Sequence, residues 1–421
     1  MELPRSLAPF RQRAYARFWF GAFVSNIGTW METVAVGILV TEQTGQAGWA
    51  GLVAAAAFVP SAFAGLLGGA LADRIPRRRL LLSTISVQLL LAGLLTLLTA
   101  LDAAHPAGMT VIVFLAGCAS ALGFPTYQAL LPDLVPREDL ASAMALGSAQ
   151  WNLGRVIGPA LAGIVIGVGG FEWAFALNTL SFLAVIAAIA PLRLPAPAPH
   201  NGESIRASIS TGFRFVRGDS GMRAVVVYLG LNSLLAAPFI ALVPAVALKV
   251  FDDGKIGTSV LVTAQGVGAV MMALALGGLS HRVGLRRVVL SALAVLPFAL
   301  VAYALAPTLA LAAVGIFVVG GAYLACLSGF NTVAQLRAPA ALRGRVMSVN
   351  MLVLGTLYPI GAITQGWIAD SVGLRATTTV AAVALGVSVL AVRTLRPGFD
   401  RELRAPEPEI LATAHTEVTD P

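Results

Sequence analysis

Long apolar stretches recur along the whole chain, and their length restricts what it can fold into. Each is close to the roughly 20 residues that an α-helix needs to cross a bilayer. The twelve stretches lie near residues 18–41, 48–71, 80–101, 108–131, 140–168, 173–192, 222–248, 257–280, 288–306, 309–335, 345–369 and 376–393. In hydrocarbon every backbone polar group must be satisfied within the protein, and a helix does this inside one segment. The sequence therefore predicts an all-α membrane protein with twelve transmembrane helices.

Charged residues are scarce and unevenly placed, which gives the spans a direction. They make up 11% of the chain, against about a quarter in soluble domains. The net charge of +8 comes from arginines that alternate with the spans and form no single basic patch, so we expect no nucleic-acid partner. Arginine-rich segments precede the first span, follow the second, occupy the gap after the sixth and follow the twelfth. By the positive-inside rule, both termini and the central gap are expected on the cytoplasmic side of the inner membrane.

The spans form two groups of six, separated by a polar gap. The expected segments are a cytoplasmic N-terminal segment (1–17), an N-terminal six-helix bundle (18–193), a cytoplasmic linker (194–221), a C-terminal six-helix bundle (222–395) and a tail (396–421). In the linker, Ile205, Ile209, Phe213 and Val216 recur at helical spacing, which predicts an amphipathic helix at the membrane surface. The tail has little apolar content, which predicts disorder.

A charged loop occurs twice, and this indicates duplication of a six-span unit. The first copy, after the second span, contains Gly69, Leu71, Ala72, Asp73, Arg74, Arg77, Arg78 and Arg79. A degraded copy begins 208 residues later and contains Gly277, Leu279, Arg282, Gly284, Arg286 and Arg287. The segments at the starts of the fifth and eleventh spans also match, at an offset of 203 residues. Parallel repeats of this kind occur in transporters whose substrate site lies between the halves near the bilayer midplane.

The loop from Gly69 to Arg79 resembles the signature loop between helices 2 and 3 of the major facilitator superfamily. More narrowly, the segments Phe124–Pro159 and Leu342–Ser348 resemble the efflux branch of that superfamily, which contains enterobactin exporters and macrolide efflux proteins. This resemblance implies a major facilitator fold, two parallel-repeat six-helix bundles that rock against each other. It sets the fold and says little about the substrate.

The resemblance also implies a gating loop, which we assign to Gly69, Asp73, Arg74, Arg77, Arg78 and Arg282. In the family, the acid at Asp73 engages helix-end and arginine groups across the bundle interface while the protein is open to the outside. Here Pro76 replaces a usual glycine, and His281 stands where the second copy would have its acid. Only the first half can then supply the full charged contact. The alternative is that these arginines only set topology.

Small residues in the fifth span resemble the antiporter signature of exporters in the superfamily. This helix-packing motif consists of Gly154, Gly158, Pro159 and Gly163, with Ala162 in place of one expected glycine. Small residues allow close helix approach, and proline permits a bend. Ordinary tight packing, without bearing on the direction of transport, explains the pattern equally well.

Two charges inside the bilayer are not explained by topology, namely Glu32 in the first span and Arg155 in the fifth. Both are predicted about 21 to 23 Å into their spans, at 1.5 Å per residue. Each lies on a polar stripe, Glu32 with Ser25 and Thr29, and Arg155 with Ser148 and Asn152. We therefore expect Glu32 to exchange a proton during transport, with Arg155 as its charged neighbour. The alternative is a static ion pair that fixes helix packing.

Further polar residues inside the spans are candidates for the substrate cavity. With Ser25, Thr29 and Asn152, they are Asn232, Gln265, Asn331, Gln335 and Tyr358. For each of them taken singly, a hydrogen bond between helices is the competing explanation. Cys118 and Cys326 lie in separate spans, so neither a disulfide nor a metal site is expected. No ATP-binding loop or hydrolytic motif occurs, so we expect neither a cofactor nor enzyme activity.

Together these features predict a secondary active transporter that works as a monomer in the lipid bilayer. We expect it to export small amphipathic molecules, such as drugs, siderophores or secondary metabolites, by proton antiport with alternating access. Two other transport readings remain, a dedicated exporter of one siderophore or natural product, and a lysolipid mover. Outside transport, a membrane sensor or assembly factor on the same fold is the alternative.

Overall fold

The computed structural model describes residues 5–72, 75–192, 205–339 and 342–403. The N-terminal half contains α1 (Arg13–Thr44), α2 (Ala47–Ala72), α3 (Arg77–Ala100), α4 (Pro106–Leu134), α5 (Leu140–Gly169) and α6 (Phe171–Ile189). The C-terminal half contains α8 (Ser220–Leu231), η3 (Asn232–Ala236), α9 (Phe239–Phe251), α10 (Lys255–Val283), α11 (Leu285–Leu305), α12 (Leu309–Arg337), α13 (Arg343–Val372) and α14 (Leu374–Leu395). Short helices η1 (Arg5–Arg11), η2 (Arg137–Asp139), α7 (Ile205–Gly218) and α15 (Pro397–Glu402) connect or flank them.

The number of apolar helices agrees with the twelve predicted spans. Within the described residues, eleven helical segments are long and apolar enough to cross a membrane, with α8, η3 and α9 forming one of them. The described side chains of α2 add a shorter apolar segment, Ala47–Phe63, within a helix of 26 residues. The prediction of a twelve-helix membrane protein is thus confirmed.

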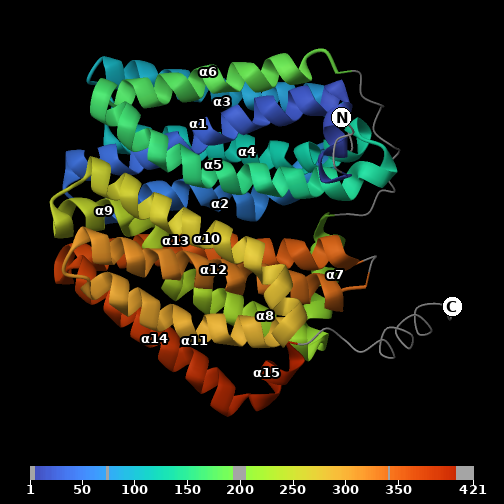
Figure 1. The fold of residues 1–421 in the computed structure, drawn as a ribbon, viewed down its shortest axis with the longest axis vertical. Helices are drawn as coiled ribbons and strands as arrows, with labels where there is room; N and C mark the ends of the chain where they lie inside the picture. Colours follow the sequence, from blue (N-terminus) through green and yellow to red (C-terminus); the bar gives the residue numbers. More distant parts are fainter. Residues whose placement is uncertain (1–4, 73–74, 193–204, 340–341, 404–421) are drawn as a thin grey trace.

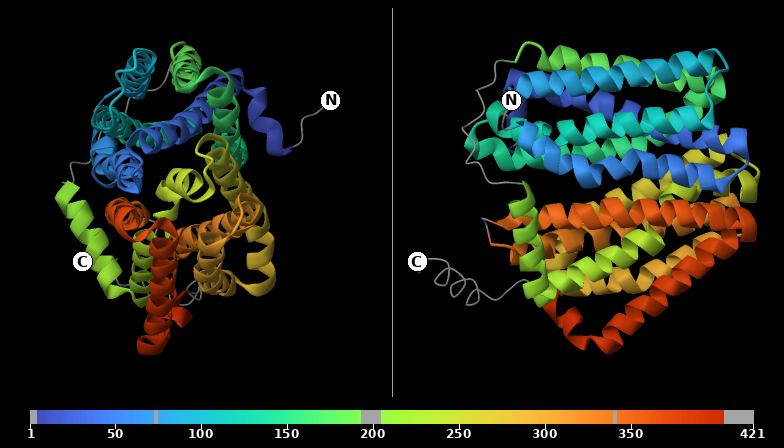
Figure 2. Two further views of the ribbon diagram at one scale, coloured as in Figure 1. Left: turned by 90° about the vertical axis from the view of Figure 1, so that its left-hand side faces the viewer. Right: turned by 180° about the vertical axis from the view of Figure 1, so that it is seen from behind.

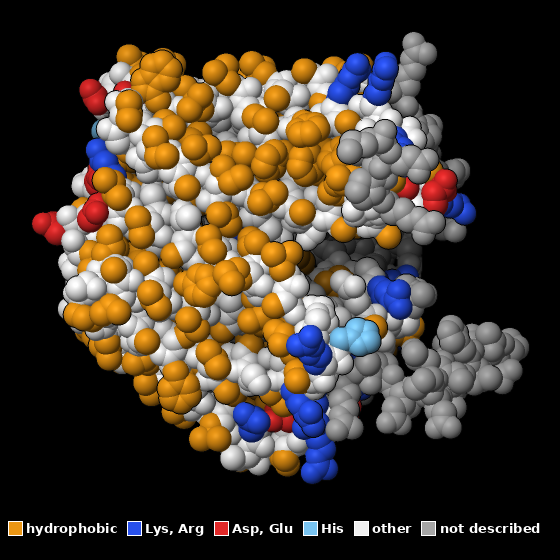
Figure 3. All heavy atoms as spheres, in the orientation of Figure 1, with side chains coloured by type: hydrophobic (Ala, Val, Ile, Leu, Met, Phe, Trp, Pro, Cys, Tyr) orange, Lys and Arg blue, Asp and Glu red, His pale blue; other side chains and the backbone are white. Residues whose placement is uncertain are grey.

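The two halves lie side by side, and the axes of most helices are roughly aligned with one another (Figure 1). The flanking helices η1, α7 and α15 lie at one end of the molecule, which we call the terminal end; the opposite end is the far end (Figures 1 and 2). Apolar side chains cover the surface between these ends, and charged side chains gather at the ends themselves (Figure 3). The surface is hollowed between the halves at the terminal end (Figure 3).

The seventh span is interrupted near its middle, and proline explains the break. Residues Asn232–Ala236 form a π-helical turn between α8 and α9, and Pro238 follows after Ala237. Pro238 has no N–H, so it cannot bond the carbonyl of Leu234 four residues earlier. Gln365 of α13 supplies the missing donor, because its Nε2 donates to the carbonyls of Leu234 at 2.9 Å and Leu235 at 3.2 Å. A side chain from a neighbouring helix therefore satisfies a broken span inside the C-terminal half.

The chain after the last span differs from the disordered tail expected from residue 396. Its first residues form α15, and Leu403 is fully buried. Asp400 accepts hydrogen bonds from Tyr228 and Arg393, both at 2.7 Å. The Glu402 carboxylate pairs with Arg337 at 3.1 Å. These charged contacts order a segment whose composition alone predicts disorder; the rest of the tail lies outside the described residues.

Candidate functional site

Glu32 lies in the middle of α1 and faces α6. Its carboxylate accepts a hydrogen bond of 2.6 Å from Nδ2 of Asn178. Ser181 fixes the orientation of that amide, because its hydroxyl donates to the carbonyl of Asn178 at 2.6 Å and to its Oδ1 at 3.1 Å. Gly28, one turn before Glu32, allows this approach, since an added Cβ would lie 2.5 Å from the Asn178 amide oxygen. A neutral amide therefore holds the carboxylate.

Arg155 lies on α5 and faces a different side of α1. Its guanidinium lies over the ring of Trp30, 5.8 Å from the centroid. The Trp30 ring meets Trp151 edge-on at 6.0 Å, and Trp151 is 53% exposed. The backbone of Arg155 also approaches α10 in the other half, since an added Cβ at Gly266 would lie 3.2 Å from the Arg155 carbonyl oxygen. Arg155 thus sits between the halves, in an aromatic setting that suits a cation.

The structure does not join Glu32 to Arg155 in an ion pair. Among the described residues, neither has an oppositely charged partner within salt-bridge distance. Successive residues on a helix are about 100° apart, so Trp30 and Glu32 point in nearly opposite directions from α1. Trp30 faces α5 and Glu32 faces α6. The two charges share a bundle, as expected, but in this conformation they occupy separate sites.

The helix-packing motif of α5 lies where it meets two other helices. An added Cβ at Gly154 would lie 2.5 Å from Asn26 of α1, and one at Gly158 would lie 2.6 Å from the Cβ of Trp30. An added Cβ at Gly163 would lie 2.6 Å from the hydroxyl of Ser259 on α10, in the other half. Pro159 is buried beside them. The motif therefore allows α5 to touch both its own bundle and the opposite one.

The hydrogen bonds that Thr29 and Asn152, two other cavity candidates of the N-terminal half, make lie within their own helices. Ser25 is buried and Thr29 is exposed, where its carbonyl accepts a bond from Thr33. Asn152 donates to the carbonyl of Ser148 in its own helix. Sequence reasoning missed Asn26, whose amide donates to the carbonyl of Gln150 at 3.0 Å and so ties α1 to α5. The signal for it was an asparagine one turn before Trp30, on the same face.

In the C-terminal half, two candidate amides are buried without a hydrogen-bond partner. Asn232 is 1% exposed and Gln265 is 3% exposed, and the described residues provide no partner for the amide of Asn232 or for Nε2 of Gln265. Leaving such a group unpaired costs about 1–3 kcal/mol. Tyr358 meets the ring of Phe58 on α2 edge-on at 5.3 Å, across the two halves. Asn331 is partly buried and Gln335 is exposed.

The gating loop is only partly visible. Asp73 and Arg74 lie outside the described residues, and Gly69 belongs to the last turn of α2. Two further arginines of the first copy bind within their own half: Arg77 pairs with Asp133 of α4, and Arg78 donates to the carbonyl of Ala190 after α6. Arg282 is exposed, and no described residue bonds it. In this conformation Arg77 and Arg78 thus hold the start of α3 to its neighbours.

Comparisons with known proteins agree with this architecture. A family model described as transmembrane secretion effector matches residues 5–413. The chain is 30% identical over 378 residues to the multidrug efflux pump Tap of Mycolicibacterium fortuitum, which covers 85% of this chain and 90% of that protein. It is 26% identical over 407 residues to the enterobactin exporter EntS of Citrobacter koseri, covering 94% of each.

The fold also matches solved transporter structures. A bacterial homologue of the human lysosomal transporter Spinster aligns with a TM-score of 0.76 at 14% identity, covering 95% of this chain and 99% of that one. At that identity the likeness shows the fold alone. The family and the relatives confirm the resemblance noted from the signature loop and the prediction of a transporter instead of an enzyme. The chain therefore belongs to the transmembrane secretion effector family, in the efflux branch of the major facilitator superfamily.

Proposed function

We propose that this protein exports small amphipathic molecules from the cytoplasm by alternating access, in exchange for protons. The names of its relatives, a multidrug efflux pump and a siderophore exporter, support export of small molecules. The observation that carries the proton-coupled part is the carboxylate of Glu32, inside a transmembrane helix and held by the neutral amide of Asn178. An ionisable group at such a depth is costly and is retained for a function.

The arginine distribution supports an orientation with the terminal end in the cytoplasm. Arg11, Arg78, Arg217 and Arg282 all lie in segments at that end. The hollow between the halves then opens toward the cytoplasm (Figure 3). Toward the far end the halves touch where Gly163 of α5 meets Ser259 of α10. They also touch near the middle, where Tyr358 meets Phe58. This is the conformation in which an exporter accepts its substrate.

Glu32 suits proton exchange because its partner is uncharged. A carboxylate locked to an arginine must break an ion pair in order to gain a proton, whereas Asn178 imposes no such requirement. Water reaching the site from one side, then from the other, would load and release the proton. Ser181 holds the amide in place throughout, so that the site is preorganised for the charged form.

The substrate region has the chemistry that amphipathic molecules require. Trp30 supplies aromatic surface beside Arg155, Trp151 packs edge-on against Trp30, and Tyr358 adds a ring from the opposite half. Ligand sites are mostly apolar, with a few polar groups that fix orientation. The unpartnered amides of the C-terminal half could provide those groups.

Uptake into inverted membrane vesicles, whose cytoplasmic face points outward, tests the coupling under an imposed pH gradient. We expect gradient-driven transport of a fluorescent amphipathic dye, and its loss in Glu32→Gln at equal expression. Glu138→Gln is the matched control, because Glu138 is exposed in η2 and has no place in the site. Equal gradient dependence in wild type and Glu32→Gln would refute the role of Glu32.

A dedicated siderophore exporter is the second candidate, and Arg155 favours it. No described acid pairs with this guanidinium, so an anionic substrate would find an available cation between the halves. We expect Arg155→Gln to reduce export of anionic substrates at least tenfold, while Arg155→Lys retains part of it and cationic dyes are unaffected or exported faster. Equal losses for anionic and cationic substrates would show that Arg155 is structural.

A further inference from the structure

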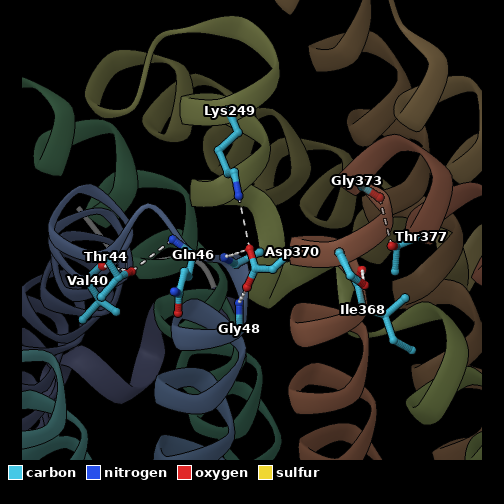
Figure 4. Close-up of polar contacts among 11 residues, drawn as sticks. Val40, Thr44, Gln46, Gly48, Lys249, Ile368, Asp370, Gly373 and Thr377 are labelled. Carbon is cyan, nitrogen blue, oxygen red and sulfur yellow. Dashed lines mark hydrogen bonds and ion pairs between the residues drawn. The ribbon is translucent and has the colours of Figure 1, made fainter.

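A carboxylate of the C-terminal half caps a helix of the N-terminal half at the far end. Asp370, near the end of α13, accepts hydrogen bonds from the backbone N–H groups of Ala47 at 2.7 Å and Gly48 at 2.8 Å (Figure 4). The ammonium group of Lys249 on α9 lies 3.1 Å from the same carboxylate. We call Asp370, Ala47, Gly48 and Lys249 the far-end cluster.

The electrostatics of the far-end cluster favour a carboxylate at this position. The first N–H groups of a helix have no partner within it, and the helix dipole places positive charge there. Such caps usually come from a residue just before the helix. Here the backbone N–H of Gln46, just before α2, donates to the hydroxyl of Thr44 at the end of α1, while Asp370 meets the donors of α2 from 323 residues away in sequence. The cap of α2 thus depends on contact between the halves.

Close backbone packing places the cap within reach. An added Cβ at Gly51 of α2 would lie 2.2 Å from the carbonyl of Ala362 on α13. An added Cβ at Gly366 of α13 would lie 2.9 Å from the carbonyl of Ala47. The two helices therefore touch through glycines beside the cluster. Any conformation that separates α2 from α13 at this end must break both hydrogen bonds to Asp370.

A second charged contact joins the halves at the same end. The ammonium of Lys255, at the start of α10, lies 5.3 Å from the centroid of the Phe171 ring, at the start of α6. Lys249 and Lys255 are the only two lysines in the chain, because every other basic side chain is an arginine or histidine. Both lysines thus lie at the seam between the halves on the far side.

We propose that Asp370, positioned by Lys249, holds the far-end gate closed and must release the start of α2 before that side can open. This inference rests on the proposed alternating access, but it concerns the gate and not the substrate or the proton. Loss of the Asp370 charge should raise the ratio of far-end-open to far-end-closed molecules by on the order of tenfold, the scale of a helix cap combined with a charged hydrogen bond.

Distance measurements across the far end test this in the purified full-length protein. Spin labels at Val168→Cys and Ile256→Cys, in a background with Cys118 and Cys326 replaced, report on opposite halves at exposed positions outside the cluster. We expect Asp370→Asn to shift the distribution toward longer distances. Asp252→Asn is the matched control, since Asp252 is exposed at the same end and asparagine tolerates its positive φ of 56°. An unchanged distribution in Asp370→Asn would overturn the proposal.

Lysine chemistry gives a second readout in intact cells. In a Lys255→Arg background, Lys249 is the only lysine side chain for a membrane-impermeant amine reagent. We expect Asp370→Asn to increase its labelling several-fold, because the ammonium loses its partner. If Asp370→Asn folds poorly, Lys249→Gln should give a smaller shift in the same direction in the spin-label experiment. If Asp370→Asn opens the gate but the protein exports nothing in any assay, the proposed function is refuted and the gate proposal stands. If the protein exports normally and Asp370→Asn leaves the gate unshifted, the gate proposal is refuted and the proposed function stands.

Discussion

Adding one methyl group at Gly28 should disable the Glu32 site by displacing the partner of Glu32, without changing Glu32 itself. The new Cβ would lie 2.5 Å from the amide oxygen of Asn178 and 2.6 Å from the hydroxyl of Ser181. Both atoms belong to short side chains that are already hydrogen-bonded, so neither can move away at low cost. Either α1 and α6 separate, at about 1–3 kcal/mol for overpacking, or Asn178 releases Glu32, at about 1.5–3 kcal/mol for a hydrogen bond to a charged group.

We therefore expect Gly28→Ala to lower proton-driven efflux roughly tenfold or more at equal membrane expression, since about 1.4 kcal/mol corresponds to tenfold. The assay is proton-driven dye uptake into inverted vesicles, normalised to transporter content. Gly93→Ala is a matched control, because its Cβ would meet α6 only at Thr179, at an ordinary 3.6 Å. Adding Asn178→Ala to Gly28→Ala removes the closer of the two clashes but also the partner of Glu32, so it should not restore transport. Wild-type efflux in Gly28→Ala would refute the assigned geometry.

Two further predictions concern packing between elements. Gly51→Ala should favour molecules open at the far end by at least fivefold, because its Cβ would lie 2.2 Å from a backbone carbonyl of α13; the spin-label distances check this, with Gly167→Ala, which meets nothing within 4 Å, as the control. Asp219→Ala should destabilise the C-terminal half by roughly 2–4 kcal/mol, because Asp219 both caps α8 at the N–H of Met222 and binds Arg337 at 2.7 Å. Thermal unfolding in detergent measures the loss, and an unchanged midpoint would contradict it.

Apolar length made the helices predictable, because spanning a bilayer is a local property of each segment. The faces of the helices were harder. The polar stripes of Glu32 and Arg155 predicted that the two charges are neighbours, yet α1 contacts α5 through Trp30 and α6 through Glu32. Which neighbour each face meets depends on how the bundle packs, and this is not contained in the periodicity of one helix.

Contacts between distant parts of the chain were also outside the reach of sequence reasoning. Asp370 reads as a charge at the end of a span, which topology explains by itself, until the structure brings it to the start of α2. The same holds for Asp400 and Glu402, whose partners Tyr228 and Arg337 lie in helices far away in sequence. A duplicated loop revealed two halves, but the interface between them depends on three-dimensional packing.

Counterflow in proteoliposomes tests the central claim, that Glu32 couples export to protons, most directly. Substrate exchange at equal pH on both sides needs no net proton movement, whereas uphill accumulation driven by a pH gradient does. We expect Glu32→Gln to keep exchange near the wild-type rate and to lose gradient-driven accumulation together with the accompanying proton flux. Accumulation and proton flux that persist in Glu32→Gln would contradict it.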